Sequence, residues 1–323
     1  MDSFEDKIAV ITGGGTGMGR ELARQLAAAG CHVAMCDVSD ENMAQTKALC
    51  EEERDDVRIT TCLADVSDEA QLIAFREHVL REQNTDCVNL VFNNAGIGGA
   101  GSMINDEREA WERTFNICWY GVYYGTRTFL PLLMAAEEGH LVNTSSVNGF
   151  WAALGPDVSH TAYSAAKFAV KGFTEALVTD LKLNAPHVNV SVVMPGHIGT
   201  SIVINSGRVL GTDPKEMSDA DLDEARENML GRGMEVANAT NEQIRGALVM
   251  MGEMFRDAAP MTAADAATVI LDGVRAKRWR ILVGDDAVAL DRMVREDPEN
   301  AYTQEFMDRL IAEANWGLGN LAG

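Results

Sequence analysis

Tyr163 and Lys167 are the two residues whose types and spacing first indicate chemistry. Residues four apart lie one turn apart on the same helix face, and only serine and alanine separate these two, so a ligand could approach closely. A free tyrosine titrates near about pH 10, too high for a base at neutral pH, but a neighbouring ammonium group favours the phenolate. Without support from other residues, the pair is more typical of a solvated helix face.

A glycine-rich turn near the start of the chain predicts a dinucleotide-binding unit. The apolar run 8–11 suits a strand, the turn 12–20 has the pattern T-G-x-x-x-G-x-G, and a helical pattern continues to Gly30. Glycine lets the backbone approach a pyrophosphate, and the N-terminus of the next helix supplies N–H donors and a favourable dipole. The strand before and the helix after make a plain tight turn the weaker interpretation.

Asp37 ends the next strand, about twenty residues beyond the glycines. A carboxylate there can accept hydrogen bonds from both hydroxyls of an adenosine ribose, and it repels a 2′-phosphate. No arginine or lysine follows it directly, and none stands between Gly13 and Gly19. These residues predict NAD rather than NADP. The alternative role for Asp37 is a helix N-cap, for which Ser39 or Asp40 is better suited.

The sequence resembles the short-chain dehydrogenase/reductase family through motifs spread over its first two hundred residues. The motifs are the glycine turn, Asn93-Asn94-Ala95-Gly96, Asn143-Thr144-Ser145-Ser146, the Tyr163/Lys167 pair and the turn from Pro195 to Thr200. The resemblance implies one α/β domain over residues 1–323, a Rossmann-type doubly wound parallel sheet of about seven strands with helices on both faces. It also implies an oxidoreductase that transfers hydride between NAD(H) and a secondary alcohol or ketone.

The resemblance assigns catalytic roles to four residues. Tyr163 is expected to be the general acid/base, and Lys167 to lower its pKa and bind the nicotinamide ribose. Ser146 is expected to hydrogen-bond the substrate oxygen, and Asn116, at a helix kink, to hold a water that links the lysine to solvent. Ser146 precedes Tyr163 by a longer gap than is usual in the family, and Asn89 stands where aspartate is frequent.

The same resemblance implies which residues hold the cofactor. Asp65 and Val66 are expected at the adenine, and Ile198 and Thr200 at the nicotinamide carboxamide. The complete expected set is Gly13, Thr16, Gly17, Met18, Gly19, Asp37, Asp65, Val66, Asn93, Ala95, Gly96, Tyr163, Lys167, Pro195, Ile198 and Thr200. No metal site is expected, because the six cysteines show no CxxC spacing and suit buried free thiols.

The substrate side of the site is expected to be enlarged. Residues 201–260 correspond to an expanded substrate loop, and residues 285–323 form a C-terminal extension. The expected pocket residues are Ser146, Phe150, Trp151 and His197, and the helix carrying Met250, Met251 and Met254 is expected to cover them as a lid. Such a pocket favours bulky apolar alcohols or ketones. An ordinary amphipathic helix on the core is the alternative, and residues 205–221 are expected to be the most mobile.

Charge excludes several kinds of partner. The chain has 323 residues and a net charge of −22, which disfavours nucleic acid, anionic membrane surfaces and acidic carrier proteins. The acidic start shows no signal-peptide pattern, and no apolar run is long enough to span a bilayer, so a cytoplasmic location is expected. An amphipathic C-terminal tail is a candidate contact in a homodimer or homotetramer.

Two other functions compete with the NAD-dependent oxidoreductase. A non-catalytic NAD-binding sensor or scaffold is disfavoured because a replaced Tyr163 or Lys167 would be its signature. An NADPH-dependent 3-oxoacyl-carrier reductase is disfavoured by Asp37 and by the acidic surface.

Overall fold

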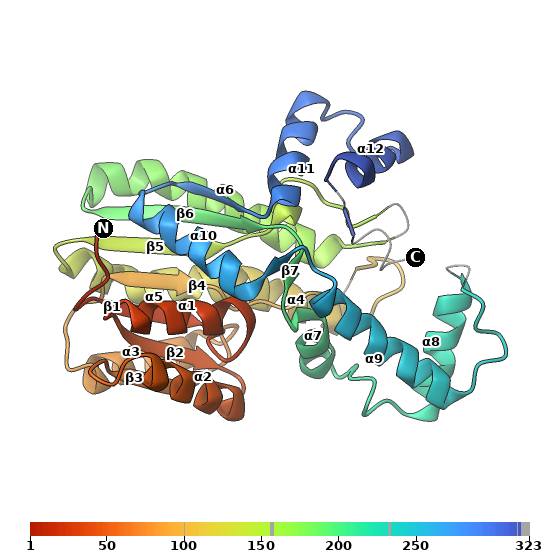
Figure 1. Ribbon diagram of the computed structural model, residues 1–323, viewed down its shortest axis with the longest axis horizontal. Coiled ribbons are helices and arrows are strands. Elements are labelled where there is room, and N and C mark those ends of the chain that lie inside the picture. The colour runs from red at the N-terminus through yellow and green to blue at the C-terminus, as the bar shows by residue number, and fades with distance from the viewer. Residues whose placement is uncertain (100, 156–157, 232–233, 315, 318–323) are drawn as a thin grey trace.

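A seven-stranded parallel sheet forms the centre of the molecule (Figure 1). The computed structural model describes residues 1–323 except 100, 156–157, 232–233, 315 and 318–323. The strand order is β3-β2-β1-β4-β5-β6-β9, and every neighbouring pair is parallel. The strands are β1 Ile8–Thr12, β2 His32–Asp37, β3 Ile59–Leu63, β4 Leu90–Asn93, β5 Gly139–Thr144, β6 Val188–Pro195 and β9 Arg280–Val283. The predicted doubly wound Rossmann-type sheet is therefore confirmed.

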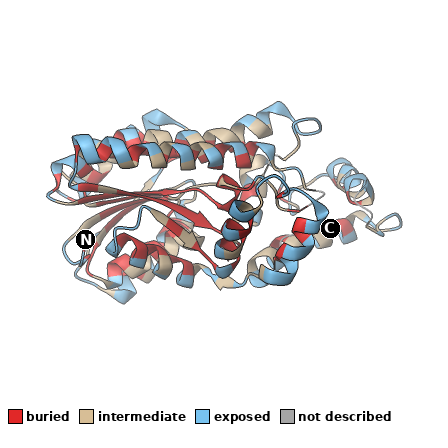
Figure 2. Cartoon of the chain, turned by 90° about the horizontal axis from the view of Figure 1, so that it is seen from above, coloured by how far each residue is buried: buried red, intermediate tan, exposed pale blue. Residues whose placement is uncertain are grey.

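Helices cover both faces of this sheet. Along β1, Ala9 and Ile11 belong to one buried core and Val10 to another, as expected for a strand buried on both faces. The first core is closed by α1 Gly17–Ala28, α2 Asp40–Glu53 and α10 Ala263–Arg275. The second is closed by α3 Glu69–Glu82, α5 Gly121–Ala135 and α6 Thr161–Asn184. Figure 2 shows buried residues on both sides of the sheet and exposed ones on the outer helix faces.

The long helical stretch between β4 and β5 contains a change of winding. It begins as α4 Arg108–Phe115, continues as a π-helical segment over Asn116–Tyr120, and becomes α5 at the next residue. A π turn widens the helix by one residue and redirects the side chains that follow. The change starts at Asn116, the residue expected at a kink.

The enlarged segment begins and ends at adjacent points of the fold. Strand β7 Ile198–Gly199 pairs in parallel with β8 Met261–Thr262. Between them lie α7 Ile202–Leu210, α8 Asp219–Gly231 and α9 Asn241–Asp257. Helices α8 and α9 pack through a small core of their own and project from the body of the molecule (Figure 1). Helix α9 is the expected helix that carries Met250, Met251 and Met254, whereas α7 was not expected from the sequence.

The C-terminal extension packs on the loop that follows β5. Helices α11 Asp285–Glu296 and α12 Gln304–Ala314 form a core with Trp151, Phe306 and Trp316. The indole Nε1 of Trp151 donates a hydrogen bond to the Ala301 carbonyl at 2.7 Å, which satisfies its polar atom in the buried position. Parts of the predicted extension (315 and 318–323) and of the long loop (Pro156 and Asp157) lie outside the described residues.

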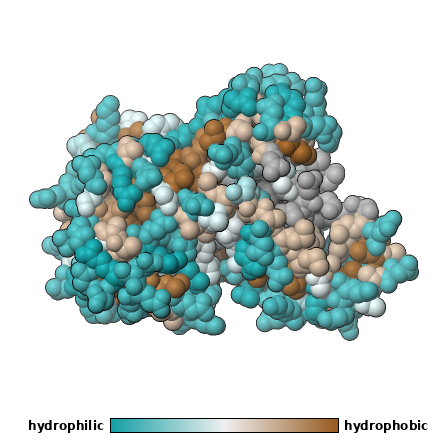
Figure 3. All heavy atoms as spheres, viewed as in Figure 1, coloured by the Kyte–Doolittle hydropathy of each residue, from teal (hydrophilic) through white to brown (hydrophobic). Residues whose placement is uncertain are grey.

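Hydrophilic side chains cover most of the face shown in Figure 3, in keeping with the net charge of −22. Among the described residues, none of the helices combines the length and the apolar character needed to cross a lipid bilayer.

One buried histidine links the core to pH. His140 on β5 is 1% exposed, and its Nε2 lies 2.7 Å from the Ser191 Oγ. The Ser191 hydroxyl donates a hydrogen bond to the Arg278 carbonyl. The Ser191 oxygen therefore accepts a hydrogen bond from the Nε2–H group of the imidazole. Burial lowers the pKa of His140 to about 3, which means that the imidazole stays neutral in the folded protein.

We expect the free energy of unfolding to fall less steeply on acidification in the His140→Gln variant than in the unmodified protein. Below about pH 6.5 the unfolded chain binds a proton at this histidine that the folded chain refuses until about pH 3. Stability must therefore fall on acidification through this window, by up to about 1.4 kcal/mol per pH unit for this group. Urea unfolding at pH 7, 6 and 5 measures the slope. Equal slopes for the variant and the unmodified protein would contradict the assignment.

Candidate active site

Two adjoining cavities lie at the carboxyl ends of the strands, where the strand order reverses between β1 and β4. We call the first the glycine cavity, about 390 Å³, because the glycine turn lines it. The second, about 300 Å³, is the tyrosine cavity, since Tyr163 and Lys167 line it. The two share the residues Met18, Asn94, Gly96, Thr200 and Ile202, so they form one continuous crevice. Parallel α/β sheets bind ligands in this kind of crevice.

The glycine turn leaves a bare backbone surface at the start of α1. Gly13 and Gly17 have φ values of +68° and +55°, a conformation that favours glycine. A Cβ on Gly19 would overlap the Gly13 carbonyl oxygen, so the first turn of α1 can pack against the loop only without a side chain there. No acidic residue occupies the first turn of α1, and Gly17 and Met18 at its start line the cavity. This cradle fits a diphosphate.

Asp37 lies on the rim of the glycine cavity at the end of β2. Its Oδ2 accepts a hydrogen bond from the Gly15 N–H at 2.9 Å, and its Oδ1 accepts one from the Ser39 N–H at 3.2 Å. Burial raises the pKa of the Asp37 carboxyl, and these N–H donors oppose that rise. Ser39, not Asp37, caps α2 by accepting from the Asn42 N–H. Asp37 is therefore not the cap of α2, and its expected role toward an adenosine ribose stays a prediction.

The far end of the glycine cavity contains an ion pair. Asp65 Oδ2 lies 2.5 Å from Arg113 Nη2, and Asp65 Oδ1 accepts from the backbone and hydroxyl of Ser67. Val66 lines the cavity beside them. The sequence analysis expected Asp65 and Val66 here and missed Arg113, whose partner is 48 residues away in the chain.

Tyr163 and Lys167 both face the tyrosine cavity from α6. The ammonium Nζ of Lys167 donates to the Thr144 carbonyl at 2.9 Å and lies 5.4 Å from the centre of the Tyr163 ring. Lys167 is 2% exposed, and burial lowers the pKa of its ammonium group. Burial also raises the pKa of the Tyr163 phenol, and a hydrogen bond with Ser146 opposes that rise. The role expected of Lys167, to favour the Tyr163 phenolate, stays a prediction.

Two of the expected residues, Asn116 and Asn93, lie behind the cavity walls. Asn116 lines neither cavity; it begins the π-helical segment that packs against α6. Asn93 is buried and donates from Nδ2 to Asn143 Oδ1 at 2.8 Å and to Thr126 Oγ1 at 3.1 Å. Its neighbour Asn94 faces both cavities instead.

The crevice thus brings together most of the residues expected from the sequence. Of the expected cofactor set, the lining includes Gly13, Thr16, Gly17, Met18, Asp37, Asp65, Val66, Ala95, Gly96, Tyr163, Lys167, Pro195, Ile198 and Thr200, but not Gly19 or Asn93. Residues that the analysis missed include Asn94, Arg113, Ile202, Val203, Asn205, Arg208 and Phe255. Four of these lie on α7, where residues 202, 205 and 209 have a helical spacing that could have been recognised.

The expected substrate wall is corrected by the structure. Ser146 lines the tyrosine cavity, whereas Phe150, Trp151 and His197 are not among its lining residues. Trp151 is wholly buried in the core of the C-terminal extension, and Phe150 packs against that same core. Met250 and Met254 are exposed on α9, so they do not cover these aromatic rings. The loop after β5 turns toward the extension, which the sequence alone does not show.

His197 lies directly behind Phe255, which does form part of the wall of the tyrosine cavity. The backbone N–H of His197 donates to Asp286 Oδ2 at 2.7 Å. The ring Nε2 of His197 lies 2.7 Å from the Phe255 carbonyl oxygen. The His197 and Phe255 rings are 4.6 Å apart, and Phe255 lines the tyrosine cavity. His197 therefore joins the turn after β6 to α9 and, through Asp286, to α11.

Comparison with known proteins identifies the class. The family model for short chain dehydrogenase matches residues 7–209. Putative oxidoreductase SadH of Mycobacterium tuberculosis is 36% identical over 219 residues, 68% of this chain and 76% of that protein. Levodione reductase of Leifsonia aquatica is 33% identical over 213 residues, 66% of this chain and 76% of that protein. The chain belongs to the short-chain dehydrogenase/reductase family.

Solved structures agree with this assignment. A short-chain dehydrogenase/reductase from Burkholderia phymatum in complex with NAD matches with a TM-score of 0.74 and 29% identity, covering 93% of this chain and 96% of that one. A metagenomic short-chain oxidoreductase in complex with NADP matches with a TM-score of 0.53 and 26% identity, covering 60% of this chain and 84% of that one. The protein is an oxidoreductase of this family, whose fold binds a nicotinamide dinucleotide.

We expect Gly19→Ala to weaken NADH binding by at least about tenfold, roughly 1.4 kcal/mol. The added methyl group overlaps the Gly13 carbonyl oxygen, so the cradle must shift. Gly172→Ala on the exposed side of α6 is the matched control, because a Cβ there meets nothing within 4 Å. Titration of NADH fluorescence measures both. The assignment of the cradle is wrong if the two variants bind NADH equally well.

Proposed function

We propose that the protein is an NAD-dependent dehydrogenase/reductase that transfers a hydride between NAD(H) and a secondary alcohol or ketone, with Tyr163 as general acid/base. The observation that carries this proposal is that Ser146, Tyr163 and Lys167 line one cavity that is continuous with the glycine cavity. A reacting carbon in the tyrosine cavity could thus lie beside a nicotinamide whose dinucleotide extends along the glycine turn.

The proposed chemistry divides between cofactor and protein. The nicotinamide ring supplies the site that accepts or donates the hydride. In the oxidation direction Ser146 holds the substrate oxygen and Tyr163 removes the hydroxyl proton, so that the carbonyl forms as the hydride leaves. Lys167 stabilises the phenolate at short range, and its bond to the Thr144 carbonyl fixes the ammonium group in position. Reduction runs through the same residues, with Tyr163 donating the proton.

NAD is the cofactor that Asp37 favours. Its carboxylate is held at the rim of the glycine cavity by the Gly15 and Ser39 N–H groups, where it can accept the ribose hydroxyls. A 2′-phosphate there would meet a like charge in a partly buried position.

The proposed substrate is bulky and apolar. Leu154, Ile202, Val203 and Phe255 supply apolar surface to a tyrosine cavity of about 300 Å³. Such a lining gains free energy mainly by burying hydrocarbon, so it favours large apolar alcohols or ketones over small polar ones. A relative named levodione reductase is in keeping with carbonyl reduction.

We further propose a homodimer or homotetramer in the cytoplasm. Tyr120 on the π-helical segment and Phe168 on α6 are exposed aromatic residues, and these two helical segments pack against each other. A second copy of the chain could cover both side chains. The six cysteines are free thiols, as a reducing compartment would keep them.

We expect Tyr163→Phe to lower kcat by at least about 100-fold, because the ring still packs but no longer exchanges a proton. NADH binding should stay within about twofold. A panel of hydroxysteroids, terpene alcohols, aryl alcohols and aliphatic secondary alcohols, assayed with NAD at the NADH absorbance band, measures the rate. A variant that keeps a tenth or more of the activity would show that another residue is the base.

We expect Asp37→Ala to lower the ratio of kcat/KM with NAD to kcat/KM with NADP by at least about tenfold, which is about 1.4 kcal/mol. The change removes the ribose contacts and the repulsion of a 2′-phosphate together. Steady-state kinetics with both cofactors measures the ratio. Comparable efficiencies with NAD and NADP in the unmutated protein would refute the cofactor assignment.

A further inference from the structure

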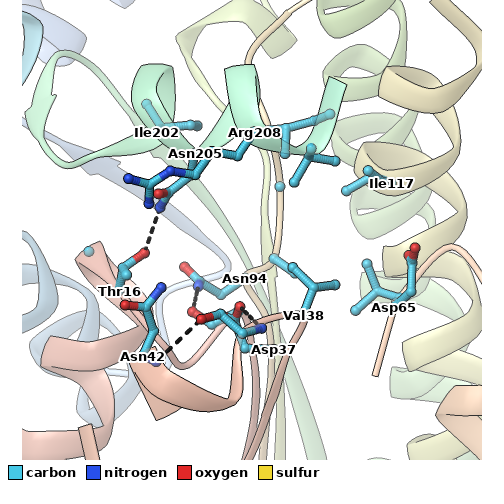
Figure 4. A pocket seen from close by; sticks show the side chains of 18 of the residues that line it. Thr16, Asp37, Val38, Asn42, Asp65, Asn94, Ile117, Ile202, Asn205 and Arg208 are labelled. Carbon is cyan, nitrogen blue, oxygen red and sulfur yellow. Dashed lines mark hydrogen bonds between the residues drawn. The ribbon is translucent and has the colours of Figure 1, made fainter. Parts of the chain in front are cut away.

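Helix α7 closes the glycine cavity from the side opposite the glycine turn. Asn205 and Arg208, one helical turn apart, face Thr16 and Asp37 across the cavity (Figure 4). The helix is tied to the turn, since Asn205 Nδ2 donates to Thr16 Oγ1 at 3.1 Å. It is also tied to the loop after β4, where the Gly98 N–H donates to Ser206 Oγ at 2.8 Å. These contacts hold Arg208 beside the cradle that fits a diphosphate.

Among the described residues that line the glycine cavity, one cationic side chain remains for a ligand. The charged ones among these residues are Asp37, Asp65, Arg113 and Arg208. Arg113 is already bound to Asp65 and Ser67 at the far end. Arg20, next to the turn, does not line the cavity and donates to the Gly15 carbonyl and to Thr46.

Arg208 is held only weakly by its own neighbour. Its Nε lies 3.3 Å from Asp213 Oδ2, and its side chain is 53% exposed. An ion pair of this kind contributes little to stability, so breaking it costs little. Asp213 also accepts a hydrogen bond from the Lys215 N–H at 3.0 Å, which remains when the arginine moves away.

We infer that Arg208 is a cofactor-binding residue, whose guanidinium leaves Asp213 and binds the diphosphate of the nicotinamide dinucleotide. A planar guanidinium matches phosphate oxygens with two parallel N–H donors, and such charge-assisted bonds are about twice as strong as neutral ones. The chain has a net charge of −22, and a cation at the cradle offsets its repulsion of a dianionic diphosphate. The inference deepens the proposed function but does not depend on the choice between NAD and NADP, because both contain this group.

The consequence concerns the substrate side. Ile202 and Val203 lie on the same helix and line the tyrosine cavity. A diphosphate bound by Arg208 therefore adds a contact that fixes the helix from which two residues of the substrate wall project.

The test compares Arg208→Gln with Arg292→Gln, which removes the same charge from an equally exposed position on α11, outside both cavities. Dissociation constants are measured for NADH and NADPH by fluorescence, and for ADP-ribose and adenosine by calorimetry. We expect Arg208→Gln to weaken binding of NADH, NADPH and ADP-ribose alike, by about tenfold or more for a lost charged hydrogen bond. Adenosine binding, and every constant of the control, should stay within twofold. Arg208→Lys should recover part of the loss.

Asp213→Asn supplies an independent arm. It breaks the ion pair and leaves the arginine in place, so NADH binding should be unchanged or tighter. Thermal unfolding checks that each variant is folded. If Arg208→Gln does not fold, the test rests on Arg208→Lys and Asp213→Asn.

Four results would overturn the inference. One is ADP-ribose binding to Arg208→Gln within twofold of the unmutated protein. Another is an equal loss for adenosine, and a third is a larger loss for NADPH than for NADH, which would place the guanidinium at the ribose. If the unmutated protein bound neither dinucleotide nor ADP-ribose, the family function would fail as well. Tighter binding of NADPH than NADH with the Arg208 loss intact would refute only the proposed NAD preference.

Discussion

The crevice depends on a chain of buried hydrogen bonds directly beneath it. Asn93 at the end of β4 donates to Asn143 on β5, and Asn143 donates in turn to Thr174 on α6 at 3.0 Å. Buried amides are costly unless they are paired, so these bonds specify one alignment of the strand ends with the helix. Lys167 lies two turns before Thr174 on α6. The positions of the ammonium group and the phenol are thereby tied to the sheet and not to a surface loop.

The parts of the site that the sequence could predict are those with strict local requirements. A backbone that must approach a diphosphate needs glycine at Gly13, Gly17 and Gly19, and a tyrosine and lysine that must share a face need a spacing of four. Asp37 could be placed because it ends the strand that follows the first helix. Such requirements are visible in a short stretch of residues, and the strand order then follows from the fold that contains them.

The parts that could not be predicted are set by contacts between distant segments. Trp151 looked like a pocket residue because it follows Ser146 closely, yet its indole is bonded to Ala301, 150 residues further along the chain. Phe255 gave no signal apart from a helical stripe, since its place in the wall depends on His197. Local pattern indicates that such a side chain will be buried, but not which of several cores will receive it.

The paired strands β7 and β8 have a consequence for how this enzyme could diversify. All of the chain from α7 to α9 leaves the fold at Gly199 and returns at Met261, the partner of Ile198 in the ladder. Because both ends are fixed side by side, lengthening the intervening chain adds only a small entropic cost and moves no strand. Residues 211–260 thus form an exchangeable module. Substitutions and changes of length there can alter the cavity wall at Phe255, while Tyr163 and Lys167 on α6 and the residues of α7 that line the glycine cavity stay in place.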